Sequence, residues 1–284
     1  MIFKLRAATL PELEEFMVRL LGSDWEAGDG AIHFCADLPL AALSGAAFFQ
    51  NARIFLKALD RNGGTGATEA GNLNRAFVQQ VFDELDMPAP RRESILQVCK
   101  VVNETDAWEL HLARVVSECA GLVSRRKKRF QLTRLGASLL SDEKCGELFW
   151  RLFMAYFRRF NLSYDFNLRT VPGIQQSMAV VLWRLDAVAR EWTAVRGLAE
   201  MILLPAVHAE LRGSMVSQWD REEWILAGYV LNPLLNFGLI EKKKPGDWPG
   251  VDEKDSIRVT GLWRSFVSFR VPGVRGASGG VGLN

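Results

Sequence analysis

The sequence predicts a mainly α-helical fold with short β-hairpins, arranged as tandem winged-helix units joined by an amphipathic helix. The main observation is a pattern that occurs twice, in residues 121–140 and 238–267. Each copy begins with Gly-Leu-Val or Gly-Leu-Ile, continues through a Lys/Arg-rich turn and an alternating strand that ends in Thr, and closes on an apolar run. Each copy also follows a stretch with helical spacing of apolar residues. A glycine that stops a helix before a hairpin with a basic tip is typical of the end of a winged-helix unit.

The repeated pattern divides the 284-residue chain into five expected segments. Between the two units, Phe149, Phe153 and Phe160 recur at helical spacing, which is typical of a packing helix. The end of the chain is rich in glycine and is expected to be disordered. The expected segments are an N-terminal cap (1–45), a first winged-helix unit (46–141), a connecting helix and loop (142–173), a second winged-helix unit (174–271) and a disordered tail (272–284).

Local signals predict the elements inside each unit. Apolar residues at helical spacing indicate helices, and Thr105 and Thr193 are suited to cap two of them. Pro233 is expected to kink or shorten its helix, because proline removes one ladder hydrogen bond. The expected elements are helices at 46–59 and 73–85, a strand at 65–68 that pairs with the hairpin 122–133, an insertion at 91–102, a helix from 105 to 120, and, in the second unit, helices that begin near 174, 193 and 220.

Composition excludes several classes of protein. The formal net charge is +2, so a signal for nucleic acid has to be local. The four cysteines are scattered without metal-ligand spacing, which argues against disulfides and zinc and favours a cytoplasmic location. No apolar run approaches the ~20 residues that span a bilayer, so no membrane association is expected. No cofactor is expected either.

The sharpest local signal is a run of five consecutive positive charges at the expected tip of the first hairpin, with another cation just beyond it. Such a tip fits the phosphate backbone or the minor groove of double-stranded DNA. A solvated turn that keeps the hairpin edge unpaired is the alternative. The candidate nucleic-acid-binding residues are Arg125, Arg126, Lys127, Lys128, Arg129 and Arg134 in the first unit and Lys242, Lys243 and Lys244 in the second.

Acidic residues oppose this interpretation at the expected recognition helices. Glu104, Asp106, Glu109 and Glu118 outnumber Arg114 there, and the second copy opens with Asp220-Arg221-Glu222-Glu223. A helix in a major groove usually presents cationic or amide side chains to the bases, so phosphates would repel these faces. Either the hairpin makes most of the DNA contacts, or the units bind a protein partner through acidic helix faces.

Signatures of catalysis are absent from the sequence. The three histidines lie far apart, without a metal-ligand or nucleophile pattern, and the glycines at 63, 64 and 66 lack the Lys-Ser/Thr of a phosphate loop. A polar cluster either caps the first helix of the second unit or lines a pocket for a small molecule or phosphate. Its members are Asn161, Tyr164, Gln175, Gln176 and Ser177. We therefore expect no enzyme and no metal site.

Several short stretches together resemble one bacterial family. They are Gly71-Asn72-Leu73, Asn103-Glu104-Thr105-Asp106, Gly121-Leu122, Leu132-Thr133 with Gly136, Phe160-Asn161 with Tyr164, Ile174-Gln175-Gln176-Ser177 and Phe237-Gly238-Leu239. Their order is similar to that in the helical, winged-helix-like region of the Ri-plasmid open-reading-frame-three family, which follows a transposon-passenger-related module. The resemblance covers roughly residues 45–270, and the large N-terminal module is missing. It implies a bacterial or mobile-element origin and a fold, without an assigned activity.

The sequence thus favours a DNA-binding or DNA-associated accessory protein, with a role in transcription regulation or a mobile element. Contact with the phosphate backbone would come from the first hairpin. A protein–protein interaction scaffold that uses the same units without DNA is the alternative.

Overall fold

A computed structural model describes residues 10–28, 30–164, 170–213, 221–243 and 249–271. Helices dominate these residues, and the strands form small antiparallel sheets of two or three strands. The predicted class, mainly α with short hairpins, is confirmed. The expected disordered tail lies outside the described residues, as do Asp220 and Lys244. Within the described residues, no helix is both long enough and apolar enough to cross a bilayer.

The first half of the chain contains the helices and strands of the first predicted unit and those that flank it. In chain order these are α1 (Leu10–Leu21), β1 (Ile32–Phe34), α2 (Ala47–Arg61), β2 (Thr65–Gly66), α3 (Arg75–Phe82), α4 (Ala89–Val98), α5 (Trp108–Cys119), β3 (Val123–Arg126), β4 (Arg129–Leu132), α6 (Arg134–Ser138) and α7 (Cys145–Arg158). Short 3₁₀ turns cover Leu40–Leu43, Asp142–Lys144 and Leu162–Tyr164.

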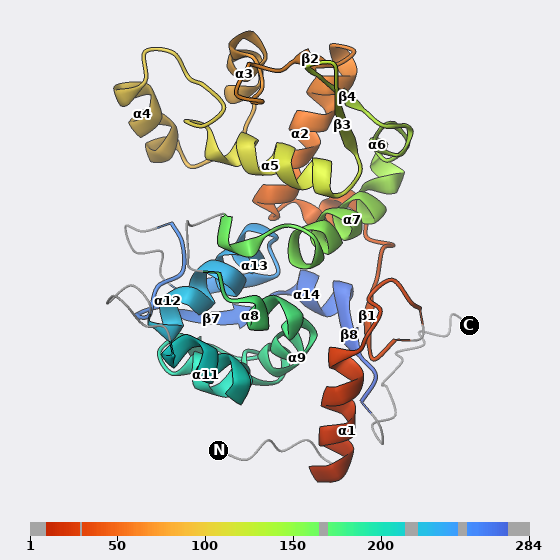
Figure 1. Ribbon diagram of the computed structural model, residues 1–284, viewed down its shortest axis with the longest axis vertical. Coiled ribbons are helices and arrows are strands. Elements are labelled where there is room, and N and C mark those ends of the chain that lie inside the picture. Colours follow the sequence, from red (N-terminus) through yellow and green to blue (C-terminus); the bar gives the residue numbers. More distant parts are fainter. Residues whose placement is uncertain (1–9, 29, 165–169, 214–220, 244–248, 272–284) are drawn as a thin grey trace, which may run out of the picture.

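The second half repeats this order of helices, short strand and hairpin. Its elements are α8 (Pro172–Gln176), α9 (Met178–Val188), β5 (Thr193–Ala194), α10 (Leu198–Ile202), α11 (Pro205–Arg212), α12 (Glu222–Leu226), a π-helical turn (Ala227–Leu231), α13 (Asn232–Asn236), β6 (Ile240–Lys243), β7 (Ser256–Val259), α14 (Gly261–Phe266) and β8 (Val267–Phe269). In Figure 1 the elements from α2 to α6 occupy the upper part of the molecule, the second half lies in the lower part together with α1 and β1, and α7 lies between them.

The two three-stranded sheets have the same topology and register. Their strand orders are β2-β4-β3 and β5-β7-β6, all antiparallel. Thr65 pairs with Phe130 in the first sheet, and Thr193 pairs with Ile257 in the second. The strand expected at 65–68 is therefore confirmed. The edge strands β2 and β5 precede, in the chain, the helix that leads into each hairpin. Because they pair with β4 and β7, each hairpin is fixed to the rest of its own half.

A glycine makes the short strand of the first sheet possible. Gly64 has φ +100°, and a Cβ atom there would lie 2.5 Å from the carbonyl oxygen of Phe130. Only glycine adopts this conformation and leaves that space without strain. The end of α2 at the Gly63-Gly64 pair therefore sets how closely β2 approaches β4.

Two predicted helix caps are wrong. Thr193 lies in β5, where its hydroxyl donates to the carbonyl of Val188 at 2.7 Å, and α10 begins only after Gly197. Thr105 precedes α5, which begins at Trp108, because Asp106 instead accepts the backbone N–H of Asn103 at 2.8 Å and holds a separate turn. In each case local hydrogen bonds hold the threonine in a strand or a turn instead of at the start of a helix.

Two further predictions are refined. The segment expected as an insertion forms α4. The helix expected over 220–236 consists of α12, the π-helical turn and α13, with Pro233 in the first turn of α13. The wider turn is placed directly before the proline, whose missing N–H would interrupt an α-helical ladder.

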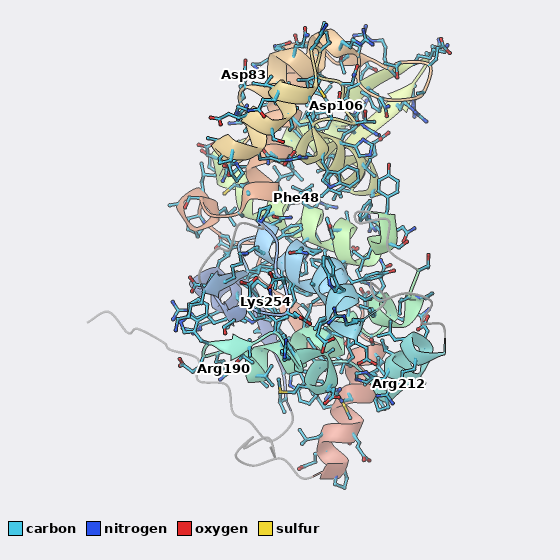
Figure 2. The ribbon with its side chains drawn as sticks, turned by 90° about the vertical axis from the view of Figure 1, so that its left-hand side faces the viewer. Phe48, Asp83, Asp106, Arg190, Arg212 and Lys254 are labelled. Carbon is cyan, nitrogen blue, oxygen red and sulfur yellow. The ribbon has the colours of Figure 1, made fainter. Side chains whose placement is uncertain are left out.

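Aromatic packing joins the two halves. The ring of Phe48 lies 5.7 Å from that of Tyr156 in α7 and 4.9 Å from that of Phe237 after α13. Figure 2 shows Phe48 in the middle of the molecule, between the two halves. The expected packing role of the connecting helix is confirmed, since α7 buries ten of its side chains or backbone positions. Strand β1 pairs with β8, so the N-terminal segment is fixed to the end of the second half.

Candidate nucleic-acid interface

The first hairpin turns through two lysines. Strands β3 and β4 pair from Val123 with Leu132 to Arg126 with Arg129, which leaves Lys127 and Lys128 as the whole turn. Their φ angles are +48° and +57°, both left-handed. This conformation belongs to a type I′ turn. Such turns favour Asn-Gly, because most residues with a Cβ atom are strained in the left-handed region. A Lys-Lys pair therefore makes this turn less stable than Asn-Gly would.

The strand register sorts the basic residues onto two faces. Arg125 is opposite Phe130, which is fully buried, so both belong to the inner face. Arg126 is opposite Arg129, and since faces alternate along a strand, this pair lies on the outer face. Both side chains are exposed. Like charges directly opposite each other on a sheet repel and destabilise the pairing.

Some of these cations have partners in the chain. Arg125 donates to the carbonyl of Gly71 at 3.3 Å, and Arg129 donates to that of Gly63 at 3.4 Å. Lys128 lies 2.6 Å from Glu69, with side chains 67% and 89% exposed. An ion pair so exposed contributes little, because water and salt screen it. The basic tip therefore keeps most of its positive potential.

Three cations of this set remain unpaired. Among the described residues, neither a carboxylate nor a hydrogen-bond acceptor contacts Arg126, Lys127 or Arg134. All three are exposed. They are the charges most available to an anion.

The second hairpin differs from the first at the equivalent position. Lys242 is opposite Ile257 on the inner face, as Arg125 is opposite Phe130. Its ammonium lies 3.4 Å from Asp255 and donates to the carbonyl of Gly250, and its side chain is only 8% exposed. The register therefore turns Lys242 into the interior, away from the surface that a nucleic acid would contact.

The other cations of the second hairpin surround a tryptophan. Lys243 is exposed, with its ammonium 5.9 Å from the ring centre of Trp192, and the guanidinium of Arg258 lies 4.6 Å from the same ring. Arg258 also pairs with Glu241 at 2.6 Å. Lys244 lies outside the described residues. Lys243 thus remains a surface cation, and the charge of its neighbour Arg258 is partly neutralised by Glu241.

Helix α5, at the position of a recognition helix, is not a surface helix. Each of its residues is buried or partly buried, and it packs against α2 and α7. In Figure 1 it crosses the molecule between α2 and α7. A helix packed in this way presents no open face to a major groove.

The acidic face expected on this helix is also not formed. The Glu104 side chain is completely buried, Glu118 pairs with Arg114, and Glu109 lies 3.4 Å from Arg91. In the second half, Glu222 lies 2.7 Å from His208 and 3.6 Å from Arg212. These carboxylates are neutralised within the chain. These four carboxylates therefore do not form an open acidic surface, which lessens the repulsion expected from them.

Glu104 organises a buried polar network that the sequence did not reveal. Its carboxylate accepts from Nδ1 of His111 at 2.8 Å, from Nε of Arg114 at 2.6 Å and from the backbone N–H of Leu73. Burial on its own would raise the pKa of this carboxyl. The hydrogen bond from His111, the charge of Arg114 and the N–H of Leu73 outweigh burial and hold the pKa of Glu104 below its usual range.

The network ends at a tyrosine from another segment. Nε2 of His111 lies 2.8 Å from the hydroxyl of Tyr164, which belongs to the 3₁₀ turn after α7. The Trp108 ring lies near both, 5.1 Å from the His111 ring and 6.0 Å from that of Tyr164. A histidine on one helix and a tyrosine far along the chain leave no spacing pattern, so the sequence pointed to Tyr164 and to the Asn103-Glu104-Thr105-Asp106 stretch separately and did not connect them.

The polar cluster predicted around Tyr164 separates into local contacts. Asn161 accepts the hydroxyl of Ser163 at 2.8 Å, and Gln175 donates to the carbonyl of Phe160 at 2.9 Å. Ser177 donates to the carbonyl of Gly173 at 2.6 Å. The bonds of Gln175 and Ser177 satisfy backbone carbonyls at the end of α7 and within α8, but none of the cluster's described side chains caps the start of α8, and Gln176 and Ser177 also line a cavity.

Two cavities lie elsewhere on the molecule. One, of about 240 Å³, is lined by residues before β1 and at the end of α7, among them Trp25, Met154 and Arg158. The other, of about 370 Å³, lies between α8 and α11, with Leu21, Pro172 and Val207 in its wall. Neither is lined by the first hairpin or the Glu104 network. Within the part of the chain that the structure describes, no group of three or more His, Cys, Asp or Glu residues could hold a metal ion.

Comparison with known proteins connects the first half to an uncharacterised family. Residues 44–145 match the family model described as the Y4jL N-terminal domain, a range that runs from before α2 to the first residue of α7. A curated relative, the uncharacterized protein y4jL of Sinorhizobium fredii (strain NBRC 101917 / NGR234), is 30% identical over 109 residues. These are 38% of this chain and 49% of the relative, so the match spans about half of the relative's length. No solved structure matches.

Proposed function

We propose that this chain is a DNA-binding accessory or regulatory protein that contacts the phosphate backbone of double-stranded DNA. The contact surface is the tip and outer face of the β3–β4 hairpin, with Arg126, Lys127 and Arg129 as its central residues. Lys128, Arg125 and Arg134 add positive potential around them. Phosphate contacts of this kind position a protein on DNA without reading its sequence.

The facing arginines carry the proposal. Arg126 and Arg129 repel each other across the hairpin, and Lys127-Lys128 occupies a turn suited to Asn-Gly. Four adjacent residues thus break two local rules for a stable hairpin. Such conflicts are expected where a surface is selected for function rather than stability. An anion bound at the tip would relieve the repulsion, and DNA supplies a closely spaced row of them.

The topology of each half supports its identification as a winged-helix unit. The order of helix, short strand, two or more helices and hairpin, with the short strand at the sheet edge, fits that architecture in both halves. We infer that the units contact DNA through the wing alone, because α5 and the helix before the second hairpin are packed inside. The first unit is the DNA-contacting one, since Lys242 of the second hairpin is buried.

Origin and location are part of the same proposal. The resemblance to the Ri-plasmid open-reading-frame-three family and the similarity to a rhizobial protein support a bacterial or mobile-element origin. Four free cysteines support a cytoplasmic location. The proposed role is binding, without turnover of a substrate.

A two-residue exchange tests the DNA contact. Lys127→Asn combined with Lys128→Gly gives the turn its favoured residues and removes two charges, so the hairpin keeps its shape. We expect affinity for a random-sequence duplex at about 50 mM salt to fall by tenfold or more, as measured by fluorescence anisotropy. The matched control, Lys254→Gln with Arg264→Gln, removes two exposed charges from the second half and should retain affinity within about twofold. Equal losses in both variants would contradict the proposal.

A protein-interaction scaffold is the second candidate. Three exposed apolar side chains favour it, namely Leu96 (53%), Val98 (81%) and Val101 (40%), in and after α4. Exposed apolar residues this close together are typical of interaction sites. Absence of DNA binding by the parent chain at about 50 mM salt would put this candidate first.

A further inference from the structure

Tyr164 is the accessible end of a chain of hydrogen bonds. Its side chain is 46% exposed, whereas those of His111 and Glu104 are 7% and 0% exposed. The hydroxyl of Tyr164 contacts Nε2 of His111, and Nδ1 of His111 contacts the carboxylate of Glu104, both at 2.8 Å. A hydroxyl, an imidazole and a buried carboxylate thus lie in hydrogen-bonded sequence.

The charges around Glu104 fix the direction of these bonds. Arg114 and the N–H of Leu73 keep the carboxylate ionised, so Glu104 accepts hydrogen bonds and donates none. Nδ1 of a neutral His111 must then carry the proton, and Nε2 must be the acceptor. Consequently the hydroxyl of Tyr164 donates to Nε2, which is the arrangement in which a general base withdraws a proton from a nucleophile.

We propose that Tyr164 is an activated nucleophilic hydroxyl, with His111 as its general base and Glu104 as the residue that positions His111. The inference goes beyond DNA binding and is independent of it. It concerns the reactivity of one hydroxyl toward tetrahedral electrophiles at sulfur or phosphorus. The phenol oxygen attacks that centre, the leaving group departs with the electron pair of its bond, and the phenol proton moves to Nε2 of His111.

The surroundings of the hydroxyl separate this role from ordinary packing. The other two tyrosines, Tyr156 and Tyr229, are buried, with 1% and 2% exposure. Tyr164 is nearly half exposed and places its hydroxyl on the histidine, with its ring nearly parallel to those of His111 at 5.8 Å and Trp108 at 6.0 Å. Because nearly half of Tyr164 is exposed, an electrophile in solvent has access to this side chain.

The chain offers a clean experiment because it contains only three tyrosines. The full-length protein is treated with an aryl sulfonyl fluoride near neutral pH, and the adduct is located and timed by mass spectrometry. Attack forms the O–S bond and releases fluoride. We expect modification at Tyr164 about 100-fold faster than that of N-acetyltyrosinamide, the range that general-base assistance supplies. A rate within about threefold of this model compound would overturn the proposal without any variant being needed.

Substitutions then separate the roles. His111→Gln keeps a hydrogen-bonding amide but removes the base, and should lower the rate at Tyr164 to about that of N-acetyltyrosinamide. Tyr164→Phe should abolish the adduct at this position while circular dichroism shows an intact helical fold. Undiminished modification in a folded His111→Gln variant would contradict the assignment of the base. DNA affinity is measured on the same samples, and we expect Tyr164→Phe to leave it unchanged, so the two proposals fail separately.

Discussion

Arg126 and Arg129 face each other across the β3–β4 hairpin, on the side turned away from the buried Phe130. Their positions are fixed by a sheet that also includes β2, so the hairpin cannot relieve the repulsion by slipping in register without exposing Phe130. The two side chains therefore form a preset pair of cations at the end of a rigid element. Backbone phosphates of DNA are ligands for such a pair, and the contact needs no information from the bases.

Removal of one facing arginine should stabilise the protein and weaken DNA binding. Arg126→Thr replaces a repelling charge with a good strand former. We expect the free energy of unfolding to rise by up to about 1 kcal/mol, as for other cross-strand pairs, and DNA affinity to fall. Urea denaturation and fluorescence anisotropy measure the two effects. A loss of stability together with unchanged affinity would mean that Arg126 supports the hairpin rather than a ligand.

Two glycines with positive φ should differ in how they tolerate alanine. Gly64→Ala adds a Cβ that collides with the backbone of β4, whereas a Cβ at Gly121 meets no atom within 4 Å. Gly121→Ala should therefore cost only the left-handed conformation, about 1–2 kcal/mol. Gly64→Ala should cost more, since β2 has to move. Thermal unfolding compares them, and equal costs would show that β2 is not held closely against β4.

The buried Glu104 should make the protein sensitive to acid. Because its pKa in the folded state is depressed, its contribution to stability is present above the ordinary value of 4.5 and is lost as the pH falls below it. Urea denaturation at pH 7, 5, 4 and 3 would show this loss. Glu104→Gln should cost up to about 3–5 kcal/mol at pH 7, since the buried Arg114 loses its fully buried partner and keeps only the partly exposed Glu118, and should flatten the acid dependence. A parallel pH dependence in the parent and the variant would contradict this role of Glu104.

Lys242 should matter for stability and not for DNA. Lys242→Met leaves the buried Asp255 without its cation, which should cost about 3–5 kcal/mol of unfolding free energy. Lys243→Met removes an exposed neighbour and should change stability by no more than about 0.5 kcal/mol. DNA affinity of a folded Lys242→Met protein should equal that of the parent. Weaker binding would return the second hairpin to the candidate interface.

The sequence predicted what is encoded locally. Thr133 and Thr260 close the two copies of the repeated pattern, and the structure gives them the same bonds: each hydroxyl donates to a glycine carbonyl at 2.8 Å, that of Gly121 or of Gly238. Each hydroxyl also accepts a backbone N–H three residues on and so begins the next short helix. Glycine stop, hairpin and threonine are neighbours in the chain, so their pattern survives in the sequence.

Other features depend on neighbours that are distant in the chain. Strand β5 has two residues, too few for a periodic pattern, and becomes a strand only because β7 lies beside it. Charge counting placed Glu104 on an exposed acidic face, whereas Arg114, His111 and Leu73 enclose it. Lys242 and Lys243 look alike in sequence, and only the register separates the buried one from the exposed one.

The salt dependence of DNA binding tests the central claim most directly. If the hairpin tip neutralises about three phosphates, the logarithm of the association constant for a random-sequence duplex should fall against the logarithm of salt concentration with a slope of about −2.7. In the variant with Lys127→Asn and Lys128→Gly the slope should be shallower by about 1 to 2, while the variant with Lys254→Gln and Arg264→Gln should keep the parental slope. No binding by the parent at about 50 mM salt, or the same slope in all three proteins, would contradict the account.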